Sequence, residues 1–200
     1  MLTAIWSLAG FLFGSIPFSL LLGRLFLKKD IRQFGDKAPG ATNVARAGGR
    51  ILYIIAVLLD AFKGTVPVLL AKDSYLVSGW ELAVVAIAPV LGHAFTPFLR
   101  FRGGMGVATT FGVWLALLGW IGPVVMGTCV GLMFIIQKNW VWGTIGGMVG
   151  LLIFLLILHY PLHLAAAWAG HTGIMFYKRY AYFRTWPELQ SWIPRAERRS

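Results

Sequence analysis

The sequence predicts an all-α, polytopic membrane protein with about seven transmembrane helices. Hydrophobic side chains make up 58% of its 200 residues and charged side chains only 12%, which is about half the charged share of a soluble domain. A soluble domain of this size could not bury so much apolar surface, and disordered chains have the opposite composition. The few charges also lie between long uncharged stretches. These observations exclude soluble globular and disordered chains.

Three apolar stretches in the N-terminal half are each long enough to cross a hydrocarbon core of about 30 Å as a helix. The first covers Leu2–Gly23, and the first charge, Arg24, comes after it. Because a secretory signal peptide begins with positive charges, we expect an uncleaved span here. The second stretch is Ile51–Ala71 and the third is Leu82–Leu99.

Two longer uncharged stretches in the C-terminal half each predict a pair of helices. The segment 103–137 holds 35 residues without a charge. As one helix it would reach roughly 50 Å, which is too long for one crossing. Gly119–Pro123 supplies helix breakers in its middle. The segment 139–177 repeats the pattern, with a break at His159–Pro161. These four helices complete the seven predicted spans.

The basic residues predict the orientation in the membrane. If the N-terminus is outside, 16 of the 18 Lys and Arg residues fall on the inner side. Their segments are 24–50, 99–105, 137–140 and 178–200. This asymmetry follows the positive-inside rule and predicts a cytoplasmic C-terminus. We therefore divide the chain into a membrane domain, 1–178, and a basic cytoplasmic tail, 179–200. Topology and anionic lipid headgroups account for the net charge of +11, so we expect membrane lipids, and no nucleic acid, as partners.

A first candidate site lies in the cytoplasmic segment 30–46, which is rich in Gly, Pro, Thr and Asn. Glycines let backbone N–H groups approach a phosphate, Thr and Asn add neutral donors, and arginine adds a bidentate charged one. A helix that begins near Thr42 and runs into the second span would also favour an anion. The alternative is an ordinary loop between helices. The candidate phosphate-binding residues are Gly40, Thr42, Asn43 and Arg46.

A second candidate site is the pair Asp60 and Lys63, inside the otherwise apolar second span. Their i, i+3 spacing places both charges on one helix face, where they can form an ion pair. Charges within a membrane are costly and usually mark a functional site. Two interpretations stay open: a catalytic pair, or a structural ion pair that fixes helix packing and positions a loop.

A third candidate site covers residues 92–109, where the third span ends in alternating arginines and aromatic residues and then a glycine-rich turn. Such a turn at the membrane surface suits an anion with an apolar tail, although the arginines also fit a simple positive-inside anchor. His93 is either a residue that orients substrate or shuttles a proton, or a packed core residue. The candidate phosphate-binding residues here are Arg100, Arg102, Gly103, Gly104, Gly106 and Thr109.

We expect no metal site and no cofactor. Cys129 is the only cysteine, and His159 and His163 flank a proline with no carboxylate near them, whereas a zinc site needs three or four ligands. The sequence also lacks a nucleotide-phosphate motif and a Gly-x-Ser-x-Gly nucleophile elbow.

Together the three segments resemble the bacterial acyl-phosphate:glycerol-3-phosphate acyltransferases, the PlsY family. The resemblance covers roughly residues 10–140 and keeps the order and spacing of the family's motifs. It rests on Gly14-Ser15-Ile16-Pro17, Gly40-Ala41-Thr42-Asn43-Val44-x-Arg46, Asp60-x-x-Lys63-Gly64, Gly92-His93-x-Phe95 and Gly103-Gly104-x-Gly106-Val107-Ala108-Thr109.

The resemblance implies an enzyme that transfers a fatty acyl group from acyl phosphate to the sn-1 hydroxyl of glycerol 3-phosphate, giving lysophosphatidic acid for phospholipid synthesis. It implies the bacterial cytoplasmic (inner) membrane, an active site that faces the cytoplasm, and a peripheral acyl-phosphate synthase as a partner. In this scheme Asp60, Lys63 and His93 are the catalytic residues. Acyl phosphate already carries a good leaving group, so positioning and fixed cations can supply the catalysis.

The sequence departs from the family pattern at three places. Gly35-Asp36-Lys37-Ala38 stands where the family usually has Gly-Ser-Gly-Asn, and Met105 replaces a lysine expected to bind a substrate phosphate. The segment after Tyr177 lacks the His and Asn often found there. Lys37 is one candidate for the missing cation. Two alternatives therefore stay open: a paralogue that acylates another phosphorylated polyol, and a non-catalytic membrane protein or lipid transporter on the same scaffold.

Overall fold

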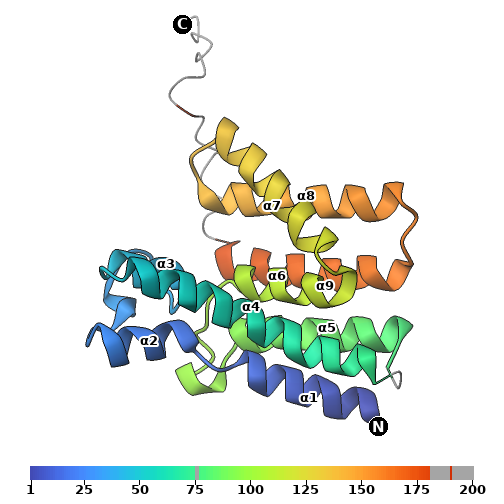
Figure 1. Cartoon of the computed structure of the whole chain (residues 1–200), viewed down its shortest axis with the longest axis horizontal. Helices are drawn as coiled ribbons and strands as arrows, with labels where there is room; N and C mark the ends of the chain where they lie inside the picture. Colours follow the sequence, from blue (N-terminus) through green and yellow to red (C-terminus); the bar gives the residue numbers. More distant parts are fainter. Residues whose placement is uncertain (75–76, 181–189, 191–200) are drawn as a thin grey trace, which may run out of the picture.

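The computed structural model describes residues 1–74, 77–180 and 190, and within these residues the regular secondary structure is entirely helical (Figure 1). The predicted all-α fold class is confirmed. Most of the predicted tail, 179–200, lies outside the described residues. The elements are α1 (Leu2–Gly14), α2 (Phe18–Phe26), η1 (Ile31–Gln33), α3 (Ala41–Arg46), α4 (Arg50–Asp73), α5 (Gly79–Ala94), η2 (Pro97–Leu99), α6 (Val107–Leu118), α7 (Ile121–Ile136), α8 (Trp140–Ile157) and α9 (Leu162–Arg179).

The outer faces of these helices suit a lipid environment. Large apolar side chains such as Leu58, Phe62 and Leu156 are more than half exposed, and a soluble protein rarely shows so much apolar surface. Helices α6 and α7 are apolar but shorter than a full span. The number of crossings and their orientation stay predictions. Within the described residues, the stretches long and apolar enough to cross a membrane are Leu2–Phe26, Arg50–Asp73, Gly79–Leu99 and Trp140–Ile157.

The first predicted span is not one continuous helix. Helix α1 ends at Gly14, and α2 begins at Phe18, directly after Pro17. Proline has no backbone N–H and so favours a helix break, although α4 and α5 continue through Pro67 and Pro89. The expectation of a single helix over Leu2–Gly23 is therefore wrong. At the break, the carbonyl of Ile16 accepts a hydrogen bond from the N–H of Phe18 at 3.0 Å and lies outside both helices.

The cytoplasmic segment requires a second correction. The helix that begins near Thr42 does not run into the second span, because α3 ends at Arg46 and α4 begins at Arg50. Between them Gly48 has a φ of 107°, a backbone conformation that favours glycine and interrupts a helix. Helix α3 is therefore a short separate element packed beside α4 (Figure 1).

Two glycines bring the central helices into close contact. Helix α1 packs on α5, and α4 packs on α6. A Cβ on Gly92 of α5 would overlap the carbonyl of Phe11 in α1, and a Cβ on Gly64 of α4 would overlap the carbonyl of Thr109 in α6. Small residues at helix crossings allow this approach in membrane proteins. Both glycines belong to the motifs recognised in the sequence, so these motifs serve packing as well as chemistry.

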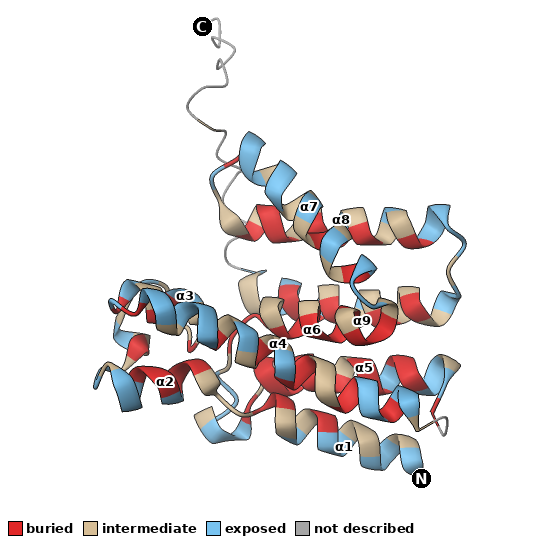
Figure 2. Cartoon of the chain, viewed as in Figure 1, coloured by how far each residue is buried: buried red, intermediate tan, exposed pale blue. Residues whose placement is uncertain are grey.

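The buried core lies around α5 and α6, while the outer helices show more exposed residues (Figure 2). Trp114 of α6 is fully buried in it. Helix α9 is fixed to this core by two hydrogen bonds: His171 donates to the carbonyl of Ala86 at 3.1 Å, and Trp168 donates to the carbonyl of Met148 at 2.7 Å. These contacts determine where the C-terminal end of α9 lies.

The two breaks predicted in the C-terminal half are confirmed. Gly119, with a φ of 63°, separates α6 from α7. The turn at His159–Pro161 separates α8 from α9, and His159 also has a positive φ, 51°. The α8–α9 hairpin returns the chain toward the start of α8, where the guanidinium of Arg179 lies 5.4 Å from the ring centroid of Trp140 (Figure 1).

Candidate active site

Three segments that are distant in the sequence meet around one cleft of about 490 Å³. They are the loop before α3, the loop between η2 and α6, and the C-terminal end of α9. Within the described part of the chain, the lining carries more positive than negative charge. Its charged and glycine residues are Asp36, Lys37, Arg102, Gly103, Gly104, Lys178 and Arg179.

The predicted ion pair between Asp60 and Lys63 is confirmed. Oδ1 of Asp60 lies 2.7 Å from Nζ of Lys63, and both side chains are almost completely buried. Oδ2 of Asp60 accepts a hydrogen bond from Ser19 of α2 at 3.0 Å. Lys63 also donates to the carbonyl of Ile16 at 2.8 Å. The pair therefore joins α4 to the break between α1 and α2, where the carbonyl of Ile16 accepts hydrogen bonds from both Lys63 and the N–H of Phe18.

His93 connects the ion pair to the glycine loop, Gly103–Gly106. Its Nδ1 lies 3.8 Å from Oδ1 of Asp60 and 3.3 Å from the hydroxyl of Thr109. On the other side of the ring, a Cβ on Gly104 would lie only 2.5 Å from Nε2, so a residue without a side chain is needed there. Asp60, Lys63, His93 and Thr109 thus form one buried cluster against the glycine loop.

This cluster does not itself line the cleft. Among the described residues around the cleft, the glycine loop stands between the solvent and His93. The arrangement favours the interpretation in which Asp60 and Lys63 brace helices and hold His93 and the loop in place. Their predicted catalytic role stays a prediction.

The loop before α3 is held by hydrogen bonds around Asn43. Its amide donates to Oδ1 of Asp36 and to the carbonyl of Ala38, both at 2.8 Å. Its own Oδ1 accepts a hydrogen bond from Arg46 at 3.1 Å. Gly35 has a φ of 54°, and a Cβ there would collide with Arg46, so this turn requires glycine. Asn43 and Arg46 therefore shape the loop that carries Asp36.

Asp36 joins this loop to the end of α9 through an ion pair with Arg179. Burial raises the pKa of the Asp36 carboxyl, but the charge of Arg179 and hydrogen bonds from Arg179, Ala38 and Asn43 lower it further. The resulting pKa lies below its ordinary value. The carboxylate is therefore ionised at neutral pH, and the two walls of the cleft are held together by charge.

The structure brings three of the predicted phosphate-binding residues to the cleft: Arg102, Gly103 and Gly104. Two others, Asn43 and Arg46, lie in the network that supports Asp36. The first and third candidate sites, read separately from the sequence, are thus parts of one site.

The remaining candidates lie beside the cleft. Gly106, with a φ of 82°, is the N-cap of α6, and Gly40 is the N-cap of α3. Thr42 and Arg100 are partly or largely exposed and are not in the cleft lining. Thr109 is fully buried beside His93 and is not in the cleft lining either. The predicted role of these five residues in binding phosphate stays a prediction.

Sequence reasoning missed Asp36, Lys178 and Arg179 as cleft residues. The two basic residues were assigned to the positive-inside boundary of the last span. Asp36 and Arg179 are 143 positions apart, and no local pattern connects them. The sequence offers one signal for them: an acidic residue in a glycine-rich cytoplasmic loop, together with two consecutive basic residues at a helix end.

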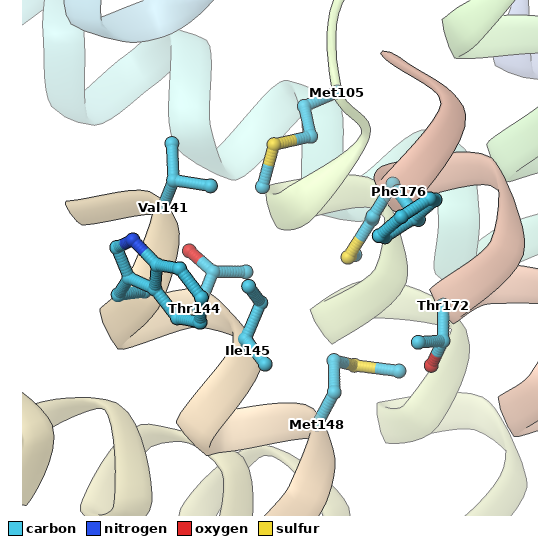
Figure 3. Close-up of a pocket in the computed structure, with 9 residues that line it drawn as sticks. Met105, Val141, Thr144, Ile145, Met148, Thr172 and Phe176 are labelled. Carbon is cyan, nitrogen blue, oxygen red and sulfur yellow. The ribbon is translucent and has the colours of Figure 1, made fainter. Parts of the chain in front are cut away.

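Met105 occupies the glycine loop but has no charge to offer. Its side chain is only 5% exposed and reaches an apolar pocket of about 290 Å³ between α8 and α9. Figure 3 shows the lining side chains converging on this space. Because Met105 also lines the cleft, the two cavities are neighbours. The remaining lining residues of the pocket are Val141, Trp142, Thr144, Ile145, Met148, Thr172, Met175 and Phe176.

Comparison with known proteins identifies the family. A family model described as glycerol-3-phosphate acyltransferase matches residues 4–185. The chain belongs to the glycerol-3-phosphate acyltransferase family. The resemblance read from the motifs is therefore confirmed, and it extends beyond the residues on which it was based.

Two curated members of this acyltransferase family are 47% and 40% identical to the chain over the aligned residues. The glycerol-3-phosphate acyltransferase of Anaeromyxobacter sp. (strain Fw109-5) is 47% identical over 131 residues, which cover 62% of this chain. Glycerol-3-phosphate acyltransferase 1 of Thermotoga maritima is 40% identical over 118 residues, which cover 58% of this chain. The chain spans 64% and 58% of the length of these two relatives.

Two crystal structures of PlsY (YgiH), an integral membrane glycerol 3-phosphate acyltransferase, share the fold. The glycerol 3-phosphate form has a TM-score of 0.84 and the lysophosphatidic acid form 0.77. Both are 27% identical to this family member and cover 91% of it and 90% of their own chains. The predicted class, a helical membrane protein, is therefore confirmed.

Within residues 1–74, 77–180 and 190, no group of three or more His, Cys, Asp or Glu side chains is placed to hold a metal ion.

Proposed function

We propose that this chain is a membrane acyltransferase that moves a fatty acyl group from acyl phosphate to the sn-1 hydroxyl of glycerol 3-phosphate, which gives lysophosphatidic acid. One observation carries the proposal: a cationic cleft and an apolar pocket share Met105 in their linings. A substrate with a phosphate at one end and an acyl chain at the other requires such a pairing of surfaces. Family membership and the glycerol 3-phosphate and lysophosphatidic acid forms of PlsY support the acceptor and the product.

The cleft supports the phosphate half of the proposal. Three basic side chains from different segments line the cleft: Lys37, Arg102 and Lys178. Gly103 and Gly104 of the loop between them line the cleft, and Gly103 is partly exposed. Glycines place their backbone against phosphate in this way in phosphate-binding loops. Fixed cations and N–H groups of this kind stabilise the negative charge that develops when an acyl carbonyl is attacked.

The apolar pocket supports the acyl half. Its volume of about 290 Å³ is about twice that of a cavity of roughly 150 Å³ that holds benzene, so it has room for on the order of ten carbons of an acyl chain. Met148 and Phe176 lie at its walls, with the loop residue Met105 at its junction with the cleft (Figure 3). The reacting carbonyl would then lie at this junction, next to the glycine loop.

In the proposed reaction, the sn-1 hydroxyl oxygen attacks the acyl carbonyl carbon and forms the ester bond. The bond from that carbon to the phosphate oxygen breaks, and inorganic phosphate leaves with the electron pair. The proton lost by the hydroxyl ends on phosphate, so no oxidant, metal or covalent enzyme intermediate is required. The role of this chain is to align two anionic substrates. We propose that Asp60, Lys63 and His93 hold the glycine loop in the required position.

The charge distribution supports the proposed location. Most basic residues lie in segments that the positive-inside rule assigns to the cytoplasm, and all the charged residues of the cleft belong to those same segments. We therefore propose the bacterial cytoplasmic membrane, with the active site on the cytoplasmic side. A soluble acyl-phosphate synthase could then deliver its product at the membrane surface.

The direct test uses purified protein in detergent with palmitoyl phosphate and glycerol 3-phosphate. We expect 1-acyl lysophosphatidic acid and one equivalent of inorganic phosphate, measured by mass spectrometry and a phosphate assay. Palmitoyl-CoA, as an alternative donor, should give no product. Positional analysis of the acyl group tests the sn-1 assignment.

A panel of acceptors separates the alternatives. Turnover with a different phosphorylated polyol, and none with glycerol 3-phosphate, would identify a paralogue with a changed acceptor. Folded protein that transfers no acyl group to any acceptor would identify a non-catalytic membrane protein or lipid transporter on the same scaffold.

A further inference from the structure

The glycine loop needs a cation from elsewhere in the fold if it is to bind a phosphate. The only side chain in the loop, that of Met105, is apolar and buried against the pocket between α8 and α9. Each phosphate monoester of the substrates carries about two negative charges near neutral pH. Backbone N–H groups alone provide only partial charges to balance them.

Lys178 is fixed next to this loop by a shared acceptor. Its Nζ donates to the carbonyl of Ala94 at 2.9 Å, and the backbone N–H of Gly103 donates to the same oxygen at 3.1 Å. The two nitrogens therefore lie within about 6 Å of each other. The ammonium also lies 5.1 Å from the ring centroid of Phe95, which restricts its position further.

The other cations of the cleft are less suited to this role. Arg179 is paired with Asp36 and stacked on Trp140, so its charge is already balanced. Lys37 and Arg102 are exposed, where water and salt weaken their interaction with an anion. Lys178 is half-buried, so its charge acts through a less polar medium.

The ammonium of Lys178 retains the capacity to bind a ligand. It has three N–H donors, and within the described residues one hydrogen bond, to Ala94, is present. Two donors can therefore turn to a phosphate at the glycine loop without loss of the anchoring bond.

We propose that Lys178 is the cation that binds a substrate phosphate at the glycine loop, in place of a charge at position 105. The inference rests on the proposed function and assigns this charge to the end of α9 rather than to the loop itself. The phosphate belongs either to the acyl phosphate or to glycerol 3-phosphate, and kinetics distinguish the two.

The test relocates the charge. Lys178→Gln should lower kcat/KM by about 10- to 100-fold, which is the loss expected for one charge-assisted hydrogen bond. Adding Met105→Lys to Lys178→Gln should raise kcat/KM at least tenfold above that of Lys178→Gln alone, because a lysine in the loop reaches the same phosphate from the other side. The substrate whose KM rises in Lys178→Gln is the one whose phosphate Lys178 binds.

Lys72→Gln is the matched control. Lys72 is also a lysine near the end of a helix that donates to backbone carbonyls, those of Ala116 and Leu117, both at 3.1 Å. It is not in the lining of the cleft, so this variant should keep wild-type kinetics. Lys178→Arg serves as a second variant that keeps the charge and the hydrogen bond to Ala94 if Lys178→Gln proves unstable.

The outcomes separate this inference from the proposed function. An active wild-type protein whose Lys178→Gln variant keeps normal kinetics would overturn the role of Lys178 and leave the proposed function standing. A loss in Lys178→Gln that Met105→Lys does not restore would assign Lys178 to helix anchoring, and would also overturn it. A wild-type protein that neither turns over nor binds either substrate, measured by calorimetry, would overturn both.

Discussion

Replacement of Lys63 with methionine should destabilise the protein severely, because it leaves a carboxylate buried without its counter-charge. Asp60 and Lys63 are 3% and 1% exposed. After the substitution, Oδ2 of Asp60 would keep its hydrogen bond from Ser19, but Oδ1 would have only His93, at 3.8 Å. Loss of one partner of a buried ion pair costs about 3–5 kcal/mol. The carbonyl of Ile16 loses the bond from Lys63 but keeps the bond from the N–H of Phe18, so this loss adds little to the cost.

A second substitution should partly rescue the Lys63→Met variant. Asp60→Asn added to Lys63→Met removes the uncompensated charge while Asn can still accept the hydrogen bond from Ser19. The double variant should therefore be about 2 kcal/mol more stable than Lys63→Met alone. Unfolding in mixed detergent micelles, followed by circular dichroism, gives the free energies. Lys72→Met, at the exposed end of the same helix, should change the free energy of unfolding by less than about 1 kcal/mol.

Two results would refute this account. One is a cost below about 1 kcal/mol for Lys63→Met, which would mean that water or lipid headgroups reach Asp60. The other is strict additivity of the two substitutions, which would mean that the side chains do not act as a pair.

Three further predictions address the cleft and the pocket. Ile145→Phe should shift the donor preference toward shorter acyl phosphates, because Ile145 lines the apolar pocket. Ile153→Phe, on the exposed side of the same helix, should leave the chain-length profile unchanged. Equal profiles for the two variants would contradict the placement of the acyl chain in this pocket. Arg46→Ala should abolish turnover, since Arg46 holds Asn43 in the loop that carries Asp36, and near-normal rates would rule out this loop as part of the site. The ion pair of Asp36 should stabilise the fold above about pH 4 and lose this contribution as the pH falls through the lowered pKa of Asp36. Between neutral and acidic pH, the Asp36→Asn variant should therefore lose less free energy of unfolding than the wild type. Parallel pH profiles of the two proteins would show that the ion pair contributes nothing.

The positions of the helices could be predicted from the sequence because apolar composition and breakers act locally. Pro17 favours the break inside the first uncharged run, but Pro67 and Pro89 lie inside continuous helices, so a proline alone did not reveal it. The same holds for Gly48, which interrupts the expected continuation of α3 into the second span. The Asp60–Lys63 pair was predictable because both partners lie one turn apart on a single helix.

The composition of the cleft could not be predicted in this way. Asp36, Gly103 and Lys178 come from three segments of the chain, and their meeting depends on how α9 packs on α5 and α8. A single sequence records no such contact. Met105 illustrates the consequence: as a loop residue it suggested a lost cation, while the fold shows a side chain that closes an apolar pocket.

The ion pair between Asp36 and Arg179 also determines when the cleft can exist during synthesis. Asp36 precedes α3, whereas Arg179 ends α9, so the two sides of the cleft leave the ribosome far apart in time. The Asp60–Lys63–His93 cluster needs only α1 to α6 and can assemble early. A chain still lacking α9 would hold this cluster but neither the closing ion pair nor the wall of the apolar pocket. The apolar pocket proposed to hold the acyl chain is therefore completed only after α9 has been synthesised, later than the cluster that supports the glycine loop.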